Sequence, residues 1–153
     1  MEKLLIALIF LTFSTCSLYS QNKTITGRLI DNDLETLPYV SILINDTIKV
    51  GKTDLNGFFH IDIAISVEKI TFNTVGIEPA TIKLVDKCNE VEVVLMLSGT
   101  YDFITLKRID KLRMKRFKKL SELHKIAFEK GIFKTSKSCY IQEFVPYYTK
   151  IKK

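Results

Sequence analysis

The chain contains few of the residues on which most catalytic and metal sites depend. It has two histidines, His60 and His124, three cysteines and no tryptophan in 153 residues. The histidines lack the H-E-x-x-H spacing that places two metal ligands on one helix face, and no two cysteines form a C-x-x-C pair. No serine lies in a G-x-S-x-G turn. The sequence therefore predicts a non-enzymatic protein with no cofactor and no metal, and structural roles for both histidines.

Acidic residues come close together only before Pro38. Asp31, Asp33 and Glu35 offer carboxylates to calcium, but their spacing lacks the D-x-D-x-D-G pattern of a calcium loop. Asp and Asn are also common in turns, where their side chains bond to nearby backbone N–H groups. We expect a turn here in preference to a calcium site.

Long apolar runs are also missing. The stretch Leu4–Phe13 is about ten residues long, whereas a membrane-spanning helix needs roughly twenty. It follows Lys3 and precedes small and polar residues as far as Ser20, which is the order of a secretory signal peptide. We expect residues 1–20 to be removed after Ser20, and the mature protein to be exported and periplasmic or associated with the outer membrane.

The cysteines qualify this picture in two ways. Cys16 ends the apolar run, where bacterial lipoproteins are acylated, although the preceding Phe13-Ser14-Thr15 is a poor match to the acylation motif. Cleavage after Ser20 would leave Cys88 and Cys139. An oxidising compartment permits a disulfide between them, which would tie the C-terminal tail to the rest of the chain. The alternative is two unpaired thiols, one of them buried as a small apolar side chain.

Charge and periodicity divide the mature chain at Ser98-Gly99-Thr100. Residues 22–99 contain 7 Lys and Arg against 11 Asp and Glu, whereas residues 101–153 contain 15 against 5. The first part consists of short alternating or β-branched apolar runs between turn residues, which is typical of an antiparallel sandwich of six or seven strands. The expected strands are Thr24–Ile30, Val40–Ile44, Phe58–Ile65, Ile70–Thr74, Thr81–Val85 and Val91–Leu97.

The second part has the period of a helix between Ile104 and Lys130. At 100° per residue one arc is apolar, and Arg113, Arg116, Met114 and Ile126 interrupt the separation. The apolar arc contains Leu106, Ile109, Leu112, Phe117, Leu120, Leu123, Ala127 and Phe128. The opposite arc contains Lys107, Arg108, Lys111, Lys115, Lys118, Lys119 and Lys125. We predict one amphipathic helix over residues 101–131, ended by Gly131, and an aromatic, lysine-rich arm over 132–153.

Two interpretations of this basic helix remain open. Its cationic face can be drawn to anionic lipid or to an acidic partner, with Lys107, Arg108, Lys111, Lys115, Lys118 and Lys119 as contacts. Alternatively, its apolar stripe covers a face or edge of the sandwich, and the lysines are only solvated. Burial of eight apolar side chains at about 1.5–3 kcal/mol each would favour that docking. Nucleic acid would also fit the charge, but an exported protein seldom meets it, so we expect no nucleic-acid partner.

The most specific local motif is Gly51–Phe59, with the sequence GKTDLNGFF. Asn56-Gly57 can supply the positive φ that a tight hairpin turn demands, and the Asp54 carboxylate can accept backbone N–H groups within the turn. We expect one of the two phenylalanines to face the core and the other to face outward. The residues Thr53, Asp54, Asn56, Gly57 and Phe59 therefore form a structural turn motif.

This motif is one of four markers through which the chain resembles the carboxypeptidase-regulatory-like domain, a transthyretin-like sandwich. The markers stand in the family's order and cover about half of the chain. They are Gly27–Asp31 (GRLID), Leu37–Ile42 (LPYVSI), Thr53–Phe59 (TDLNGFF) and Val75–Ile77 (VGI). Tyr39 stands where the family usually has glycine, and Ile77 where it usually has an aromatic residue. The markers concern the fold and imply no catalytic residue.

Together the patterns predict a mainly β protein. We expect an antiparallel seven-strand Greek-key β-sandwich over residues 22–99, then one long amphipathic α-helix and an extended tail. In the resembled family the domain accompanies metallocarboxypeptidase domains or precedes TonB-dependent outer-membrane receptors. The resemblance implies an exported binding or scaffold module of the bacterial cell envelope, with an envelope protein or glycan as partner. The alternative is a peripheral protein that places its basic helix on anionic lipid.

Overall fold

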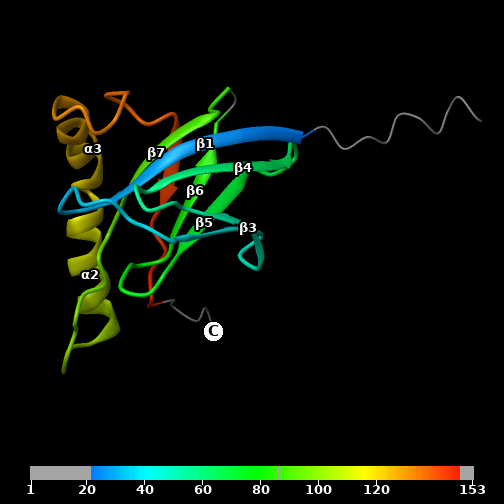
Figure 1. Ribbon diagram of the computed structural model, residues 1–153. Helices are drawn as coiled ribbons and strands as arrows, with labels where there is room; N and C mark the ends of the chain where they lie inside the picture. Colours follow the sequence, from blue (N-terminus) through cyan, green and yellow to red (C-terminus); the bar gives the residue numbers. More distant parts are fainter. Residues whose placement is uncertain (1–21, 86, 149–153) are drawn as a thin grey trace, which may run out of the picture.

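The computed structural model describes residues 22–85 and 87–148. The expected signal peptide, Cys16 within it and the end of the C-terminal arm lie outside the described residues. The described part contains eight strands and two helices (Figure 1). The strands are β1 (Asn22–Asp31), β2 (Ser41–Ile44), β3 (Ile48–Lys52), β4 (Phe58–Ala64), β5 (Lys69–Asn73), β6 (Ala80–Leu84), β7 (Glu90–Leu95) and β8 (Tyr140–Glu143). The helices are α2 (Leu106–Phe117) and α3 (Leu120–Glu129).

The eight strands form two sheets. One sheet has the order β4-β1-β7 and the other β3-β2-β5-β6-β8. Alternation along β4 shows why they pack: Phe59, Ile61 and Ile63 are buried, whereas the residues between them are exposed. Side chains from both sheets meet in one main core, including Ile25, Leu29, Ile42, Phe72, Ile82 and Val93.

One strand pair contradicts the expectation that all pairs are antiparallel. Strand β1 pairs with β7 in parallel, with Gly27 opposite Val91 and Asp31 opposite Leu95. A Cβ atom on Gly27 would lie 1.9 Å from the carbonyl oxygen of Val91. The first family marker therefore begins with a glycine that lets two backbones come close.

Two strands were missing from the sequence prediction. In β3, Lys49, Gly51 and Lys52 leave little apolar alternation. Strand β8 belongs to the C-terminal arm, which is thus more than an extended tail. It pairs antiparallel with β6, Tyr140 lying opposite Leu84 and Glu143 opposite Thr81. The arm therefore completes the five-stranded sheet at one edge.

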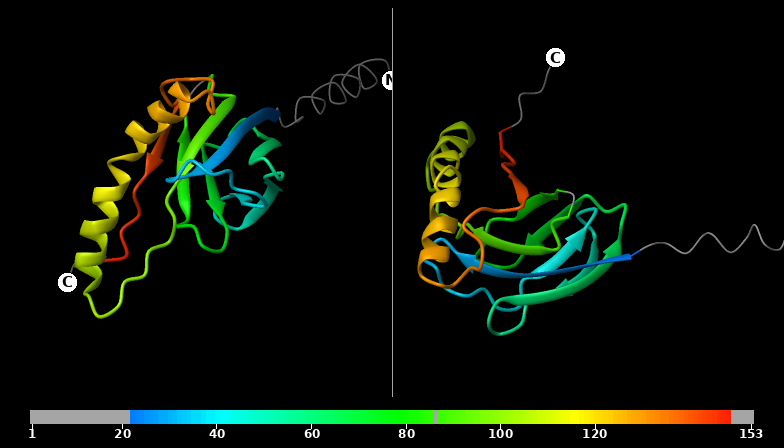
Figure 2. Two further views of the ribbon diagram at one scale, coloured as in Figure 1. Left: turned by 60° about the vertical axis from the view of Figure 1, so that its left-hand side comes forward. Right: turned by 90° about the horizontal axis from the view of Figure 1, so that it is seen from above.

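The expected long helix is divided into α2 and α3, which follow one another along one side of the molecule (Figure 2). At the junction the N–H group of Lys119 bonds to the carbonyl of Arg116, three residues back, at 3.0 Å, so the turn tightens locally. The helix ends at Gly131 as predicted: its φ is +71°, and Ile132 N–H bonds to the carbonyl of Ala127 at 2.9 Å.

The helices dock on the sheet. In β7, Val93 and Leu95 point into the main core, while Val94 and Met96, the residue after the strand, pack on the opposite face against Leu120, Ala127 and Phe133. The apolar stripe is narrower than predicted, because three of its members remain exposed: Leu106, Leu112 and Phe128. The buried part of the stripe therefore covers the outer face of the three-stranded sheet.

Candidate functional site

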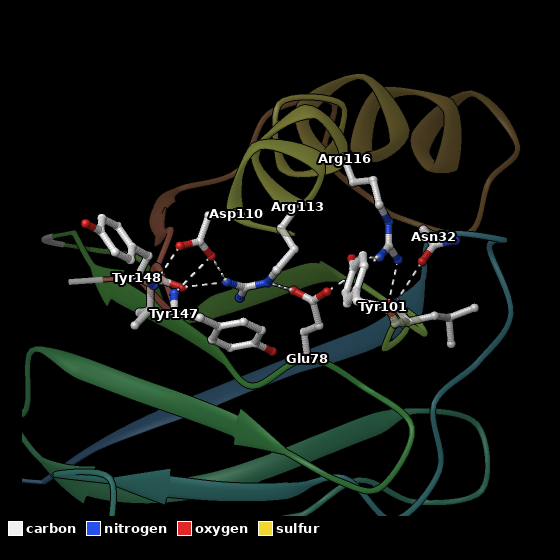
Figure 3. Close-up of polar contacts among 10 residues, drawn as sticks. Asn32, Glu78, Tyr101, Asp110, Arg113, Arg116, Tyr147 and Tyr148 are labelled. Carbon is white, nitrogen blue, oxygen red and sulfur yellow. Dashed lines mark hydrogen bonds and ion pairs between the residues drawn. The ribbon is translucent and has the colours of Figure 1, made fainter. Parts of the chain in front are cut away.

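A buried ion-pair network holds α2 against the sheets (Figure 3). Arg113, which interrupted the amphipathic pattern, lies inside: its Nε is 2.8 Å from Oε2 of Glu78, and both side chains are less than 5% exposed. Glu78 precedes β6, and its N–H bonds to the carbonyl of Met96 at 2.8 Å. The Arg113 Nη1 also donates to Asp110 at 2.9 Å and to the carbonyl of Val145 at 3.0 Å. A buried guanidinium is tolerated only when its donors are satisfied in this way.

The same network holds the end of the described arm. Asp110 accepts N–H bonds from Tyr147 at 2.9 Å and Tyr148 at 2.7 Å, and the Tyr147 ring centroid lies 3.7 Å from Cζ of Arg113. Desolvation acts to raise the pKa of Asp110, but these N–H bonds and Arg113 outweigh it and lower the pKa. Burial likewise opposes the charge of Arg113, yet Glu78 and Asp110 raise its pKa. Both groups are therefore ionised at neutral pH.

Arg116 makes the second set of links between α2 and the sheet. Its Nη2 donates to the carbonyl of Leu97 at 2.6 Å, and its Nη1 to the hydroxyl of Tyr101 at 3.2 Å. The N–H of Leu97 in turn donates to Oδ1 of Asn32 at 2.9 Å. With Arg113 and Arg116 both directed inward, the orientation of α2 is set, and its remaining basic residues face outward.

All six predicted basic contacts are exposed, four of them on α2 and two, Lys118 and Lys119, at its junction with α3. They are Lys107, Arg108, Lys111, Lys115, Lys118 and Lys119. The ion pairs of the described residues involve other cations, so none of the six has a carboxylate partner within 4 Å in that part of the chain. The result is a series of unpaired, exposed cations along α2 and its junction with α3.

Exposed apolar side chains lie beside this basic face. Phe103 precedes α2 and is fully exposed, and Leu106 and Leu112 on α2 are 51% and 43% exposed. Single exposed apolar residues are common, and Leu106 and Leu112, six positions apart on α2, flank the basic arc on its two sides without being neighbours.

The local electrostatics of α2 are unfavourable for the isolated helix. Its first turn contains Lys107 and Arg108 and no acidic residue, and Thr105 makes no side-chain cap. Cations in the first turn oppose the helix dipole by about 0.3–1 kcal/mol each. Lys107, Lys111 and Lys115 also follow one another at four-residue spacing, where like charges cost a few tenths of a kcal/mol. An anionic surface against this face would remove both penalties.

The predicted turn motif has a structural role. Asp54 Oδ1 accepts the N–H groups of Asn56 and Phe58, each at 2.8 Å, and Gly57 has a φ of +77°. The hydroxyl of buried Thr53 donates to the carbonyl of Leu37 at 2.7 Å. The turn is not a hairpin, because β3 and β4 belong to different sheets, and Asn56 is not among the residues with positive φ.

The two phenylalanines that follow the turn lie on opposite faces of β4, as expected. Phe59 is buried, whereas Phe58 is 46% exposed. The Phe59 ring packs in the main core, with its centroid 5.7 Å from that of Phe72.

Cys88 and Cys139 form a disulfide, with their Cα atoms 5.5 Å apart. The bond joins the segment before β7 to the segment before β8. Because the two cysteines are separated by 51 positions, the bridge closes the loop that contains both helices. The arm is thus attached to the sheets covalently at one end and by the Arg113 network at the other.

The remaining candidate ligands have structural surroundings. His60 is exposed on β4, whereas His124 is buried and its Nε2 lies 3.1 Å from the carbonyl of Thr135. Asp31 Oδ1 accepts the N–H groups of Asp33 and Glu35, at 2.8 and 3.0 Å, which is turn chemistry. Among residues 22–85 and 87–148, no three His, Cys, Asp or Glu side chains are grouped to hold a metal ion.

Two comparisons with known proteins give no relative. No protein-family model matches the sequence, and no curated protein matches it. Neither α2 nor α3, the helices of the described residues, is long and apolar enough to cross a membrane.

Proposed function

We propose that the mature chain is an exported, non-enzymatic binding module of the bacterial cell envelope, which places the outer face of α2 on anionic lipid. The single observation that carries this proposal is the set of six exposed cations without a carboxylate partner within 4 Å among the described residues. Among the described residues, no comparable feature favours an envelope protein or a glycan as the partner.

The physical basis is electrostatic attraction followed by shallow insertion. Each lysine near an anionic leaflet contributes about 1 kcal/mol, and the attraction decays over about 8 Å at physiological salt. Exposed Leu112, which borders the basic arc at 100° per residue, would then enter the headgroup region. The inner face of α2 stays attached to the sheets through Glu78 and Leu97, so the contact requires no unfolding.

Two further features support the export and family parts of the proposal. The disulfide between Cys88 and Cys139 belongs to an oxidising compartment, which agrees with a cleaved signal peptide. Tyr39, which replaces the usual glycine of the resembled family, has a φ of +57°, the left-handed region that glycine favours. We accordingly propose that residues 24–97 are a carboxypeptidase-regulatory-like domain with a transthyretin-like sandwich.

The test is flotation of the mature chain with vesicles. One set contains phosphatidylcholine alone and the other includes phosphatidylglycerol, each at low and high salt. Binding should require the anionic lipid and decline with salt. The double variant Lys107→Glu/Lys111→Glu should bind at least about 30-fold more weakly, because loss of the two lysine charges alone removes about 2 kcal/mol and the new carboxylates are repelled by the lipid.

The matched control is Lys49→Glu/Lys52→Glu, which reverses two exposed charges on β3 and should leave binding unchanged. Equal losses in both double variants would show a general charge effect. If the protein did not float at low salt, the lipid proposal would be wrong, and the search would move to a protein or glycan partner.

A further inference from the structure

A pocket of about 390 Å³ lies on the inner side of the same helices, between α2 and α3 on one side and β7 and β8 on the other. This volume is within the range of about 300–1,000 Å³ that is usual for small-molecule sites. Its walls include Met114, Phe117 and Leu120 from the helical segment, Val94 from β7 and Tyr140 from β8.

Side-chain bonds connect the two sheet edges that line the pocket. Strands β7 and β8 are the edge strands of their sheets and do not pair with each other. Instead the buried Tyr140 hydroxyl donates to the carbonyl of Glu92 at 2.7 Å, and Gln142 Nε2 donates to that of Val94 at 3.4 Å. Burial raises the pKa of Tyr140, so the hydroxyl keeps its proton and remains a donor. These bonds join the two edge strands that line the pocket.

The charges around the pocket favour an anion at its mouth and an uncharged chain within it. Lys118 is exposed, lines the pocket and has no carboxylate within 4 Å among the described residues, and no lining residue is acidic. His124, which also lines the pocket, is buried, and burial lowers its pKa. Burial outweighs the opposing effect of the bond from Nε2 to the carbonyl of Thr135, so the imidazole is neutral at physiological pH. Its Nδ1 is buried without a partner in that part of the chain.

We propose that this pocket binds a free fatty acid, with one alkyl chain between the helices and β7 and the carboxylate at Lys118. The volume suits one chain in preference to two, the walls are predominantly apolar, and Lys118, the one lysine or arginine among the described residues that line the pocket, is exposed to solvent. Such a ligand reaches the pocket from solution. The inference therefore does not rest on binding of α2 to a membrane.

In the experiment, dodecanoate is titrated into the mature chain below its critical micelle concentration, and the heat of binding is measured by calorimetry. Dodecyltrimethylammonium, which has the same chain and the opposite charge, is the comparison ligand. We expect saturable binding of one dodecanoate per chain, and at least tenfold weaker binding of the cation. Absence of saturable dodecanoate binding, or equal affinity for both amphiphiles, would overturn the proposal.

Three variants localise the ligand. Ser121 is exposed and lines the pocket, so Ser121→Trp should fill the space and reduce dodecanoate affinity at least tenfold. Lys118→Gln should weaken dodecanoate about tenfold without weakening the cation, whereas the neighbouring Lys119→Gln should change neither. Circular dichroism verifies the fold of each variant. Unchanged affinity in Ser121→Trp, or equal losses in the two lysine variants, would contradict the site. Vesicle flotation without phosphatidylglycerol dependence would bear only on the membrane proposal.

Discussion

Arg113 allows a sharp test of how the helices are attached, because two variants are expected to compensate one another. Replacement by Met removes the cation from Glu78, whose side chain is 3% exposed. The carboxylate then keeps only Arg116, at 3.5 Å, as a basic partner. A buried charge that loses its partner costs about 3–5 kcal/mol, so Arg113→Met should lower the free energy of unfolding by about that amount.

Glu78→Gln has a milder expected effect, because Arg113 keeps Asp110 as its counter-ion. Loss of the charged acceptor should cost about 1.5–3 kcal/mol. The double variant Glu78→Gln/Arg113→Met buries no unpaired carboxylate at position 78. It should therefore be more stable than Arg113→Met alone by about 1–3 kcal/mol.

The assay is urea unfolding at pH 7, followed by circular dichroism and compared through the midpoint at constant m-value. Lys115→Met, the same replacement at an exposed position of α2, is the matched control and should change stability by less than about 0.5 kcal/mol. Additive losses in the double variant would refute the reasoning, since they would show that Glu78 and Arg113 do not depend on each other.

Two other predictions concern covalent and backbone restraints. Replacement of Cys88 and Cys139 by serine should lower the free energy of unfolding by about 4 kcal/mol, because the unfolded chain regains the entropy of a loop of 51 residues. Thermal unfolding with and without reductant measures this loss. An unchanged midpoint would show that the bridge contributes nothing. Gly57→Ala should destabilise the fold more than Gly131→Ala. Both glycines have positive φ, but a Cβ atom on Gly57 would lie 2.5 Å from the carbonyl oxygen of Leu29, whereas the one on Gly131 meets nothing within 4 Å. Equal losses in urea unfolding would contradict this order.

Sequence reasoning succeeded where the interactions are local. The turn at Asp54 joins a side chain to backbone groups two and four residues ahead, so its motif can be read without the rest of the chain. The alternation in β4 and the helical period after Ile104 are also local patterns, and they predicted the positions of most strands and the exposed basic face. The end of α3 at Gly131 follows from the conformational freedom of a single residue.

The sites that matter most for the proposals depend on contacts between distant parts of the chain. Arg113 and Glu78 are 35 positions apart, and in the sequence Arg113 was only an interruption of a pattern. Part of the arm forms the edge strand β8 because its backbone pairs with β6. The pocket depends on the side-chain contact between β7 and β8.

By itself the sequence determined six of the eight strands, the turn, the helical region and its charge, because each depends on neighbours within a few residues. Only the tertiary structure decided the parallel pairing of β1 with β7, the burial of Arg113, the strand in the arm and the pocket under the helices. These features require segments tens of residues apart to meet, and the free energy of that meeting comes from burial and pairing that no single segment contains.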